Sequence, residues 1–130
     1  MSEAQRRLLC VLDGRRHLLP VAAIERVWPA MAMQPLPGAP AQVSGVVLLH
    51  GERVPVIRMQ PHTHDVKPGD LFVLVRSGAQ RLGFFVDAVE GVVDAAPDAV
   101  DLPDIDRLFT PEDARRLAGA LSVHAAEHPA

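Results

Sequence analysis

The chain has 130 residues, of which 48% are apolar and 22% are charged, and its formal net charge is −3. This length and apolar content suit one compact domain with its own hydrophobic core. The chain is slightly acidic, and none of its apolar runs approaches the length of about 18 residues that a membrane helix requires, so we expect neither nucleic-acid binding nor membrane insertion.

Cysteine usage and the N-terminal sequence indicate a cytoplasmic protein. Cys10 is the only cysteine, so no intrachain disulfide can form, as is usual in a reducing compartment. The apolar stretch that follows the first arginines stops at Asp13 and Gly14. It is too short and too polar for a signal peptide.

The first third of the chain predicts a β-hairpin, a helical turn and a strand. Residues 7–12 and 15–21 flank Asp13 and Gly14, a dipeptide typical of tight hairpin turns. Residues 21–28 combine helical spacing with β-branched side chains, which fits a helical turn that leads into a strand. Residues 29–40 contain four prolines and predict a loop that crosses the surface of the same domain.

The central part predicts five short strands separated by turns. They cover residues 43–49, 53–59, 71–76, 81–86 and 89–93. The first two strands turn at His50, Gly51 and Glu52. Residues 46–49 are continuously apolar, which is typical of a strand buried on both faces. Many short strands of this kind indicate an all-β barrel or sandwich.

The last third predicts one amphipathic helix. Thr110 is a good N-cap, Pro111 suits the first helical position, and two acidic residues follow in the first turn. Its apolar stripe consists of Ala114, Leu117, Ala118 and Leu121, which gives a helix of about three turns. We predict a single domain over residues 1–122 and a disordered tail over residues 123–130.

Four short motifs occur in order along the chain. They are Ile24-Glu25-Arg26-Val27, Gly45-Val46-Val47-Leu48-Leu49-His50-Gly51 with Pro55-Val56, Leu82-Gly83-Phe84-Phe85-Val86-Asp87, and the helix start at Thr110. In this order and spacing they resemble the CheW-like domain family over about residues 7–121.

The resemblance implies two small SH3-like β-barrels, the second one shortened here, and a C-terminal α-helix. It also implies a non-enzymatic adaptor without a cofactor, which couples the cytoplasmic tip of a chemoreceptor to the regulatory domain of a histidine kinase. The protein-binding residues that it implies are Ile24, Glu25, Val27, Gly45, Leu48, His50, Gly51, Arg58, Leu82, Phe84 and Asp87.

This chain departs from the family pattern in three places. The usual Asn-Leu-Arg is Leu48-Leu49-His50, and a neutral imidazole offers fewer donors than a guanidinium. Arg58 stands where the family usually has an aspartate. The segment between Val93 and Thr110 is short, and Pro103 limits the last strand to an edge or breaks it. A barrel left open at one side favours another partner, homodimerisation or aggregation.

Other readings remain open beside the adaptor. His62 and His64, with His50, could form a small metal site, although zinc needs three or four converging ligands and a solvated loop is the simpler explanation. A scaffold that self-associates through its open barrel, or that binds a different partner, keeps the fold. No nucleophile has a positioned base, so we predict no catalytic residue.

Two further residues have a structural and a functional interpretation. Trp28 is more simply core or loop packing than a binding hot spot, although tryptophan is enriched at hot spots. Asp87 follows an apolar strand, and it either forms a turn through local backbone amides or provides an interface charge.

Overall fold

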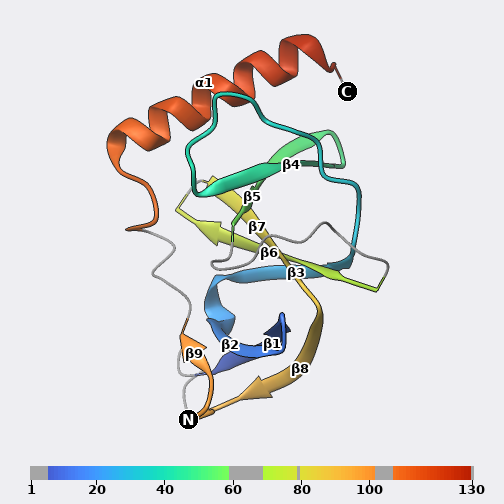
Figure 1. Ribbon diagram of the computed structural model, residues 1–130, viewed down its shortest axis with the longest axis vertical. Coiled ribbons are helices and arrows are strands. Elements are labelled where there is room, and N and C mark those ends of the chain that lie inside the picture. The colour runs from blue at the N-terminus through green and yellow to red at the C-terminus, as the bar shows by residue number, and fades with distance from the viewer. Residues whose placement is uncertain (1–5, 59–68, 79, 102–106, 130) are drawn as a thin grey trace.

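Two β-sheets and one C-terminal helix make up the part of the chain that this computed structural model describes, residues 6–58, 69–78, 80–101 and 107–129 (Figure 1). The elements are β1 (Arg7–Leu12), β2 (Arg15–Pro20), η2 (Val21–Ala23), β3 (Ile24–Pro29), β4 (Val43–Leu49), β5 (Glu52–Ile57), β6 (Leu71–Ser77), β7 (Gln80–Val86), β8 (Ala88–Val93), β9 (Val100–Asp101) and α1 (Pro111–Glu127). The predicted first hairpin, the helical turn before β3 and the central strands are confirmed. Residue 59, the predicted end of the second central strand, lies outside the described residues.

The strands form a four-stranded sheet in the order β8-β1-β2-β9 and a five-stranded sheet in the order β3-β6-β7-β5-β4. The chain passes from the second sheet to the first where β7 leads into β8. Helix α1 lies at the β4 end of the molecule, and the four-stranded sheet lies at the opposite end (Figure 1). Neither strand order closes into a ring among the described strands. The observed architecture is therefore mostly β, with two mixed sheets and one helix.

The four-stranded sheet ends in a very short strand. β9 has two residues and pairs in parallel with β2, at the outer position of the sheet. Of the two outcomes predicted for the last strand, an edge position or a break, Val100–Asp101 shows the edge position. Pro103 lies outside the described residues.

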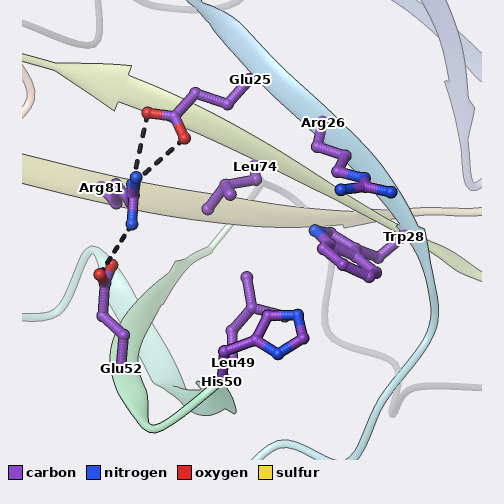
Figure 2. Close-up of a pocket in the computed structure, with 8 residues that line it drawn as sticks. All are labelled: Glu25, Arg26, Trp28, Leu49, His50, Glu52, Leu74 and Arg81. Atoms are coloured by element: carbon purple, nitrogen blue, oxygen red, sulfur yellow. Dashed lines mark hydrogen bonds and ion pairs between the residues drawn. The ribbon is translucent and has the colours of Figure 1, made fainter.

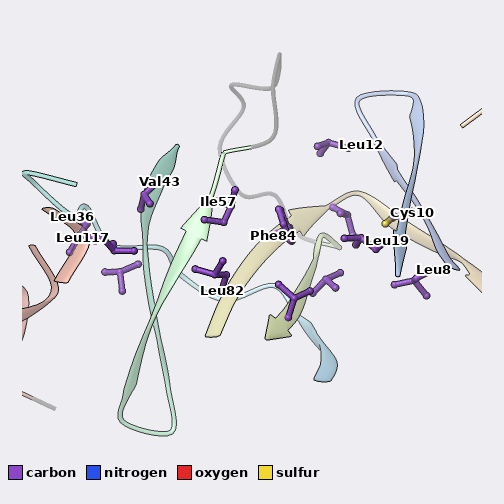
Figure 3. Close-up of a cluster of buried hydrophobic side chains, with 14 of the residues drawn as sticks. Leu8, Cys10, Leu12, Leu19, Leu36, Val43, Ile57, Leu82, Phe84 and Leu117 are labelled. Atoms are coloured by element: carbon purple, nitrogen blue, oxygen red, sulfur yellow. The ribbon is translucent and has the colours of Figure 1, made fainter. Parts of the chain in front are cut away.

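The five-stranded sheet buries apolar side chains on both faces. Along β6, Val73 and Val75 belong to a first core cluster, whereas Phe72 and Leu74 belong to a second one. The first cluster joins both sheets and α1 (Figure 3). It includes Cys10, whose burial raises the pKa of its thiol to about 11 and keeps it protonated. The second cluster lies on the opposite face.

The apolar run in β4 reflects these two clusters. Val46 and Val47 are both fully buried, Val46 in the first cluster and Val47 in the second. β4 is nevertheless the outer strand of its sheet. The proline-containing segment covers part of this edge, because Gln34 N donates to Val46 O at 2.7 Å and Val46 N donates to Gln34 O at 2.9 Å.

Helix α1 is longer than the sequence predicts. Its N-terminus has a capping box, in which Thr110 accepts from the Asp113 amide and Asp113 accepts from the Thr110 amide. It continues to Glu127, so the predicted disordered tail from residue 123 is wrong for residues 123–127. Tertiary contacts of His124 hold the last turns, and local sequence does not reveal them. No helix within the described ranges is long and apolar enough to cross a membrane.

His124 docks the last turns of α1 onto the five-stranded sheet. Its side chain is 3% exposed. Its Nε2 lies 2.8 Å from Gln34 Oε1, and its Nδ1 lies 3.1 Å from Arg53 Nε. Because Arg53 can only donate, Nδ1 must accept, so the ring is neutral and carries its proton on Nε2. Arg53 also donates to the carbonyl of His128.

Gly83 leaves room for an aromatic ring, and we predict that Gly83→Ala destabilises the fold. A Cβ at this position would lie 1.9 Å from Cζ of Phe72, which is fully buried and packs on Phe85 with ring centroids 5.1 Å apart. Overpacking of this kind costs about 1–3 kcal/mol. At Gly119, on the exposed face of α1, an added Cβ meets nothing within 4 Å, so Gly119→Ala should stabilise by up to about 1 kcal/mol. Urea unfolding measures both, and equal stability of Gly83→Ala and wild type would contradict this account.

His124 makes stability pH-dependent. Burial, followed by the positive charges of His128 and Arg53, lowers the pKa of His124. The unfolded chain therefore takes up a proton near the ordinary value of about 6.5 before the folded chain does, and the free energy of unfolding falls as pH drops through that value. His17, whose pKa burial also lowers, acts in the same direction.

In His124→Gln the side-chain amide can keep both hydrogen bonds without titrating. Urea unfolding between about pH 7.5 and about pH 5.5 should show a smaller loss of stability than in wild type. The pH dependence of stability that remains in His124→Gln then includes the contribution of His17. If the free energy of unfolding depends on pH equally in His124→Gln and wild type, His124 does not cause the loss of stability in this pH range.

Candidate functional site

An open groove lies on the second-cluster face of the five-stranded sheet (Figure 2). Its volume is about 420 Å³. Side chains from β3, β5, β6, β7 and the β4–β5 hairpin line it. They are Glu25, Arg26, Trp28, Leu49, His50, Glu52, Leu74 and Arg81.

One side of the groove is aromatic. Trp28 is half-buried against the second cluster, and the Arg26 guanidinium carbon lies 4.3 Å from the centroid of its ring. The His50 ring lies 5.4 Å from Trp28 with a tilt of 59°. A cation over an indole contributes about 0.5–1 kcal/mol at an exposed site. Trp28 thus contacts two polar side chains at the groove, Arg26 and His50.

The β4–β5 turn places His50 at this position. His50 has φ 51° and Gly51 has φ 81°, the pair of left-handed conformations that a two-residue hairpin turn requires. Glycine adopts this conformation freely, whereas histidine does so with strain. The contact with Trp28 helps to offset that strain and orients the imidazole over the groove.

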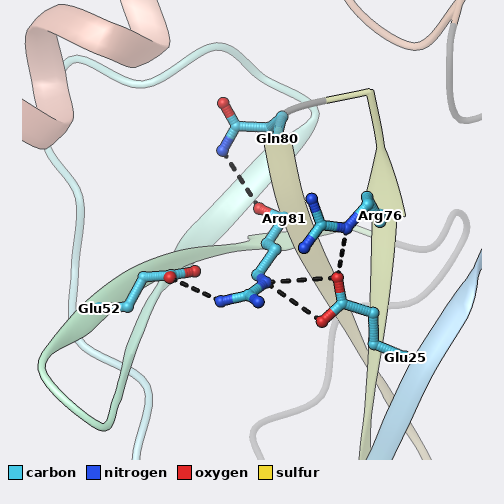
Figure 4. A network of polar contacts seen from close by, with 5 residues as sticks. All are labelled: Glu25, Glu52, Arg76, Gln80 and Arg81. Carbon is cyan, nitrogen blue, oxygen red and sulfur yellow. Dashed lines mark hydrogen bonds and ion pairs between the residues drawn. The ribbon is translucent and has the colours of Figure 1, made fainter.

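The other side of the groove is ionic (Figure 4). Arg81 Nε lies 3.1 Å from Glu25 Oε2, Arg81 Nη1 lies 2.8 Å from Glu52 Oε1, and Arg76 Nε lies 2.6 Å from Glu25 Oε1. Arg76 and Arg81 are directly opposite in the β6–β7 pair and would repel each other without Glu25. The hydrogen bond from Arg76, together with Arg81, lowers the pKa of Glu25. The network links the edge strand β3 to β5.

A β-bulge in β3 brings the two sides together. Between Ile24 and Arg26 the register of β3 against β6 shifts. Strict alternation would place neighbouring residues on opposite faces, but a bulge re-aims side chains. Glu25 and Arg26 therefore both line the groove although they are adjacent in sequence.

Comparison with known proteins shows the family to which the chain belongs. Residues 6–123 match the family described as the CheW-like domain. The chain belongs to the CheW-like domain family. Among solved structures, it resembles the scaffolding protein TtCheW from Thermoanaerobacter tengcongensis, with 20% sequence identity over 76% of this chain and 67% of that chain and a TM-score of 0.60. A search of curated protein sequences gave no significant match.

The predicted binding residues of this CheW-like domain fall partly on the groove. Glu25 and His50 line it, and Gly51 forms the turn that carries His50. Val27 is 37% exposed on the outer strand β3, and its pairing with Val73 places it on the first-cluster face. Ile24 is half-buried against the first cluster.

Three predicted residues belong to the interior of the domain. Leu82 is 1% exposed and Phe84 is 3% exposed, and both are part of the first cluster. A Cβ at Gly45 would lie 2.6 Å from Met33 Cγ and 2.7 Å from Gln34 O, so this glycine permits close packing. β7 turns the side chains of Leu82 and Phe84 into the core, and the predicted binding role of this segment stays a prediction.

Three others lie away from the groove. Leu48 is half-buried and does not line it. Arg58 follows the far end of β5, where its amide donates to Gln42 O at 2.7 Å. Asp87 Oδ2 accepts from the Asp13 amide at 2.8 Å, which joins the β7–β8 junction to the first hairpin turn. Asp87 thus accepts a turn amide, but one remote in sequence.

Sequence reasoning missed most of the groove. The sequence favours packing for Trp28 over a binding role, and Trp28 both packs on the second cluster and lines the groove. The register of β6 and β7 places Arg81 and Leu74 at the groove. Local sequence patterns do not predict this register. The Ile24–Trp28 segment contained the one available signal for the groove. Arg26 and Trp28 are two residues apart, and on a strand such residues lie on the same face.

The metal alternative has no structural support in the described ranges. His62 and His64 lie outside them. His50 contacts Trp28, and within those ranges no group of three His, Cys, Asp or Glu side chains is placed to hold a metal ion.

Proposed function

We propose that this CheW-like domain is a non-enzymatic cytoplasmic adaptor that couples chemoreceptors to a histidine kinase. Its partners are the cytoplasmic tip of a chemoreceptor and the regulatory domain of the kinase. Membership of the CheW-like family supports the proposal, as does likeness to a protein described as a scaffold. The two small barrels of the family pattern form part of the same proposal.

The observation that carries the proposal is the half-buried Trp28 in an open groove, with Arg26 and His50 in contact with it. Tryptophan and arginine are enriched at the energetic centres of protein interfaces. The groove combines an apolar floor of Leu49 and Leu74 with a charged rim, the arrangement that interfaces share. Its carboxylates are held by arginines, and Arg76 and Arg81 lower the pKa of Glu25, which makes it a poor general base.

The test is titration calorimetry with the cognate receptor tip and, separately, with the kinase regulatory domain. In His50→Asn the turn is kept, because asparagine tolerates the left-handed conformation, while the ring is lost. We expect the dissociation constant for at least one partner to rise about tenfold. Arg115→Ala, on the exposed face of α1, is the control and should bind as wild type does. Absence of any wild-type complex at tens of micromolar would refute the coupling role.

A second candidate function is self-association through the four-stranded sheet. Its outer strands are β8 and the two-residue β9, where Val92 and Val100 are 52% and 51% exposed. Unpaired strand edges with apolar side chains favour pairing with another chain. Light scattering across a concentration series should then show a defined dimer. Val92→Lys should abolish it, whereas Val123→Lys on α1 should not, and a wild-type monomer at every concentration would exclude this candidate.

A further inference from the structure

Every charged side chain that lines the groove, except Arg26, forms an ion pair with a neighbour in the described part of the chain. Arg81 pairs with Glu25 and Glu52, and Arg76 pairs with Glu25. Arg26 also lines the groove, but within the described ranges its guanidinium contacts only the Trp28 ring and has no carboxylate partner. The arginines and glutamates that line the groove balance in charge, and Arg76 adds one positive charge beside it, so Arg26 is the guanidinium that remains open to a partner.

The contact with Trp28 leaves the donors of Arg26 available. A ring contact uses the face of the planar guanidinium, whereas its five N–H donors point outward from the edge. Holding the side chain against the indole also reduces the conformational entropy that binding would remove.

The N–H donors of Arg26 have no acceptor among the described residues, which favours an anionic group on the partner. A carboxylate matches the fork of a guanidinium with two parallel hydrogen bonds, and such charge-assisted pairs are stronger than neutral ones. Leu74 is the cross-strand partner of Arg26, and Leu49 lines the groove beside His50 (Figure 2). An apolar side chain beside the carboxylate would cover them.

We propose that Arg26, held by Trp28, binds a glutamate or aspartate of the protein partner, and that a neighbouring apolar side chain of that partner packs on Leu49 and Leu74. The inference rests on the proposed function, because it specifies the partner surface that the same groove takes. β3 is the outer strand of its sheet, so the groove is accessible to an extended protein surface from that side. Arg26 is then a specificity-determining residue for this contact.

The experiment measures binding of the cognate chemoreceptor tip to full-length Arg26→Gln and Arg26→Lys at about 50 mM and about 500 mM salt. Arg26→Gln should weaken binding about tenfold at low salt and reduce the salt dependence. Arg26→Lys should be intermediate, since lysine keeps the charge but loses the planar fork. Arg115→Gln removes an exposed positive charge of α1 and is the matched control. Trp28 is the only tryptophan, so its fluorescence reports whether each variant keeps the groove.

Charge reversal identifies the partner residue. Arg26→Glu should abolish binding, and one acidic-to-lysine change on the receptor tip should restore it. If wild type binds and Arg26→Gln keeps the same affinity and salt dependence, the inference is wrong while the adaptor role stands. If wild type does not bind, the coupling role and the inference fail together.

Discussion

The five-stranded sheet has to bury both of its faces, and the rest of the domain is arranged around that requirement. Its central strands β6 and β7 carry apolar side chains toward both sides, as the alternation of Phe72 and Val73 shows. Each such side chain favours burial by about 1.5–3 kcal/mol. The first face is covered by the four-stranded sheet and α1. On the second face, the described residues that pack against the core include Trp28, Met31 and Met33, and Trp28 remains partly accessible.

The groove follows from this incomplete cover. Trp28 and Leu49 pack at the margin of the second cluster and remain partly accessible. The charges of β3, β5 and β7 then border apolar surface, which gives a site with an apolar floor and a polar rim. The domain thus supports a binding surface without a deep cavity, because the sheet itself forms the floor. Most of the residues that line it come from paired strands rather than from long loops.

Local sequence patterns predicted the elements well where short-range physics determines them. The left-handed pair at Asp13 and Gly14 and the cap at Thr110 both depend on neighbouring residues alone. Patterns failed where long-range contacts decide. The motif that contains Leu82 and Phe84 predicted a binding surface. Alternation of side chains along a strand shows that the two faces of the sheet differ, but it does not show which face the rest of the domain covers. Likewise α1 extends beyond residue 122 because His124 meets Gln34 and Arg53 from distant parts of the chain.

The candidate site was predictable only in part, because local motifs identify some of its residues and long-range strand register places the others. Glu25 and His50 were recognised from motifs that resemble the family, whereas Arg81 joins them only through strand register and Arg26 only through a bulge. The substitution in the Leu48-Leu49-His50 motif acquires a physical meaning from this arrangement. An arginine at His50 would add a fixed positive charge on the aromatic side of the groove. With histidine there, the partners of Glu25 come from the β6–β7 hairpin, and the imidazole packs on Trp28 instead. The groove therefore keeps its charge network while its aromatic side presents Arg26, so the partner that fits it carries its own carboxylate.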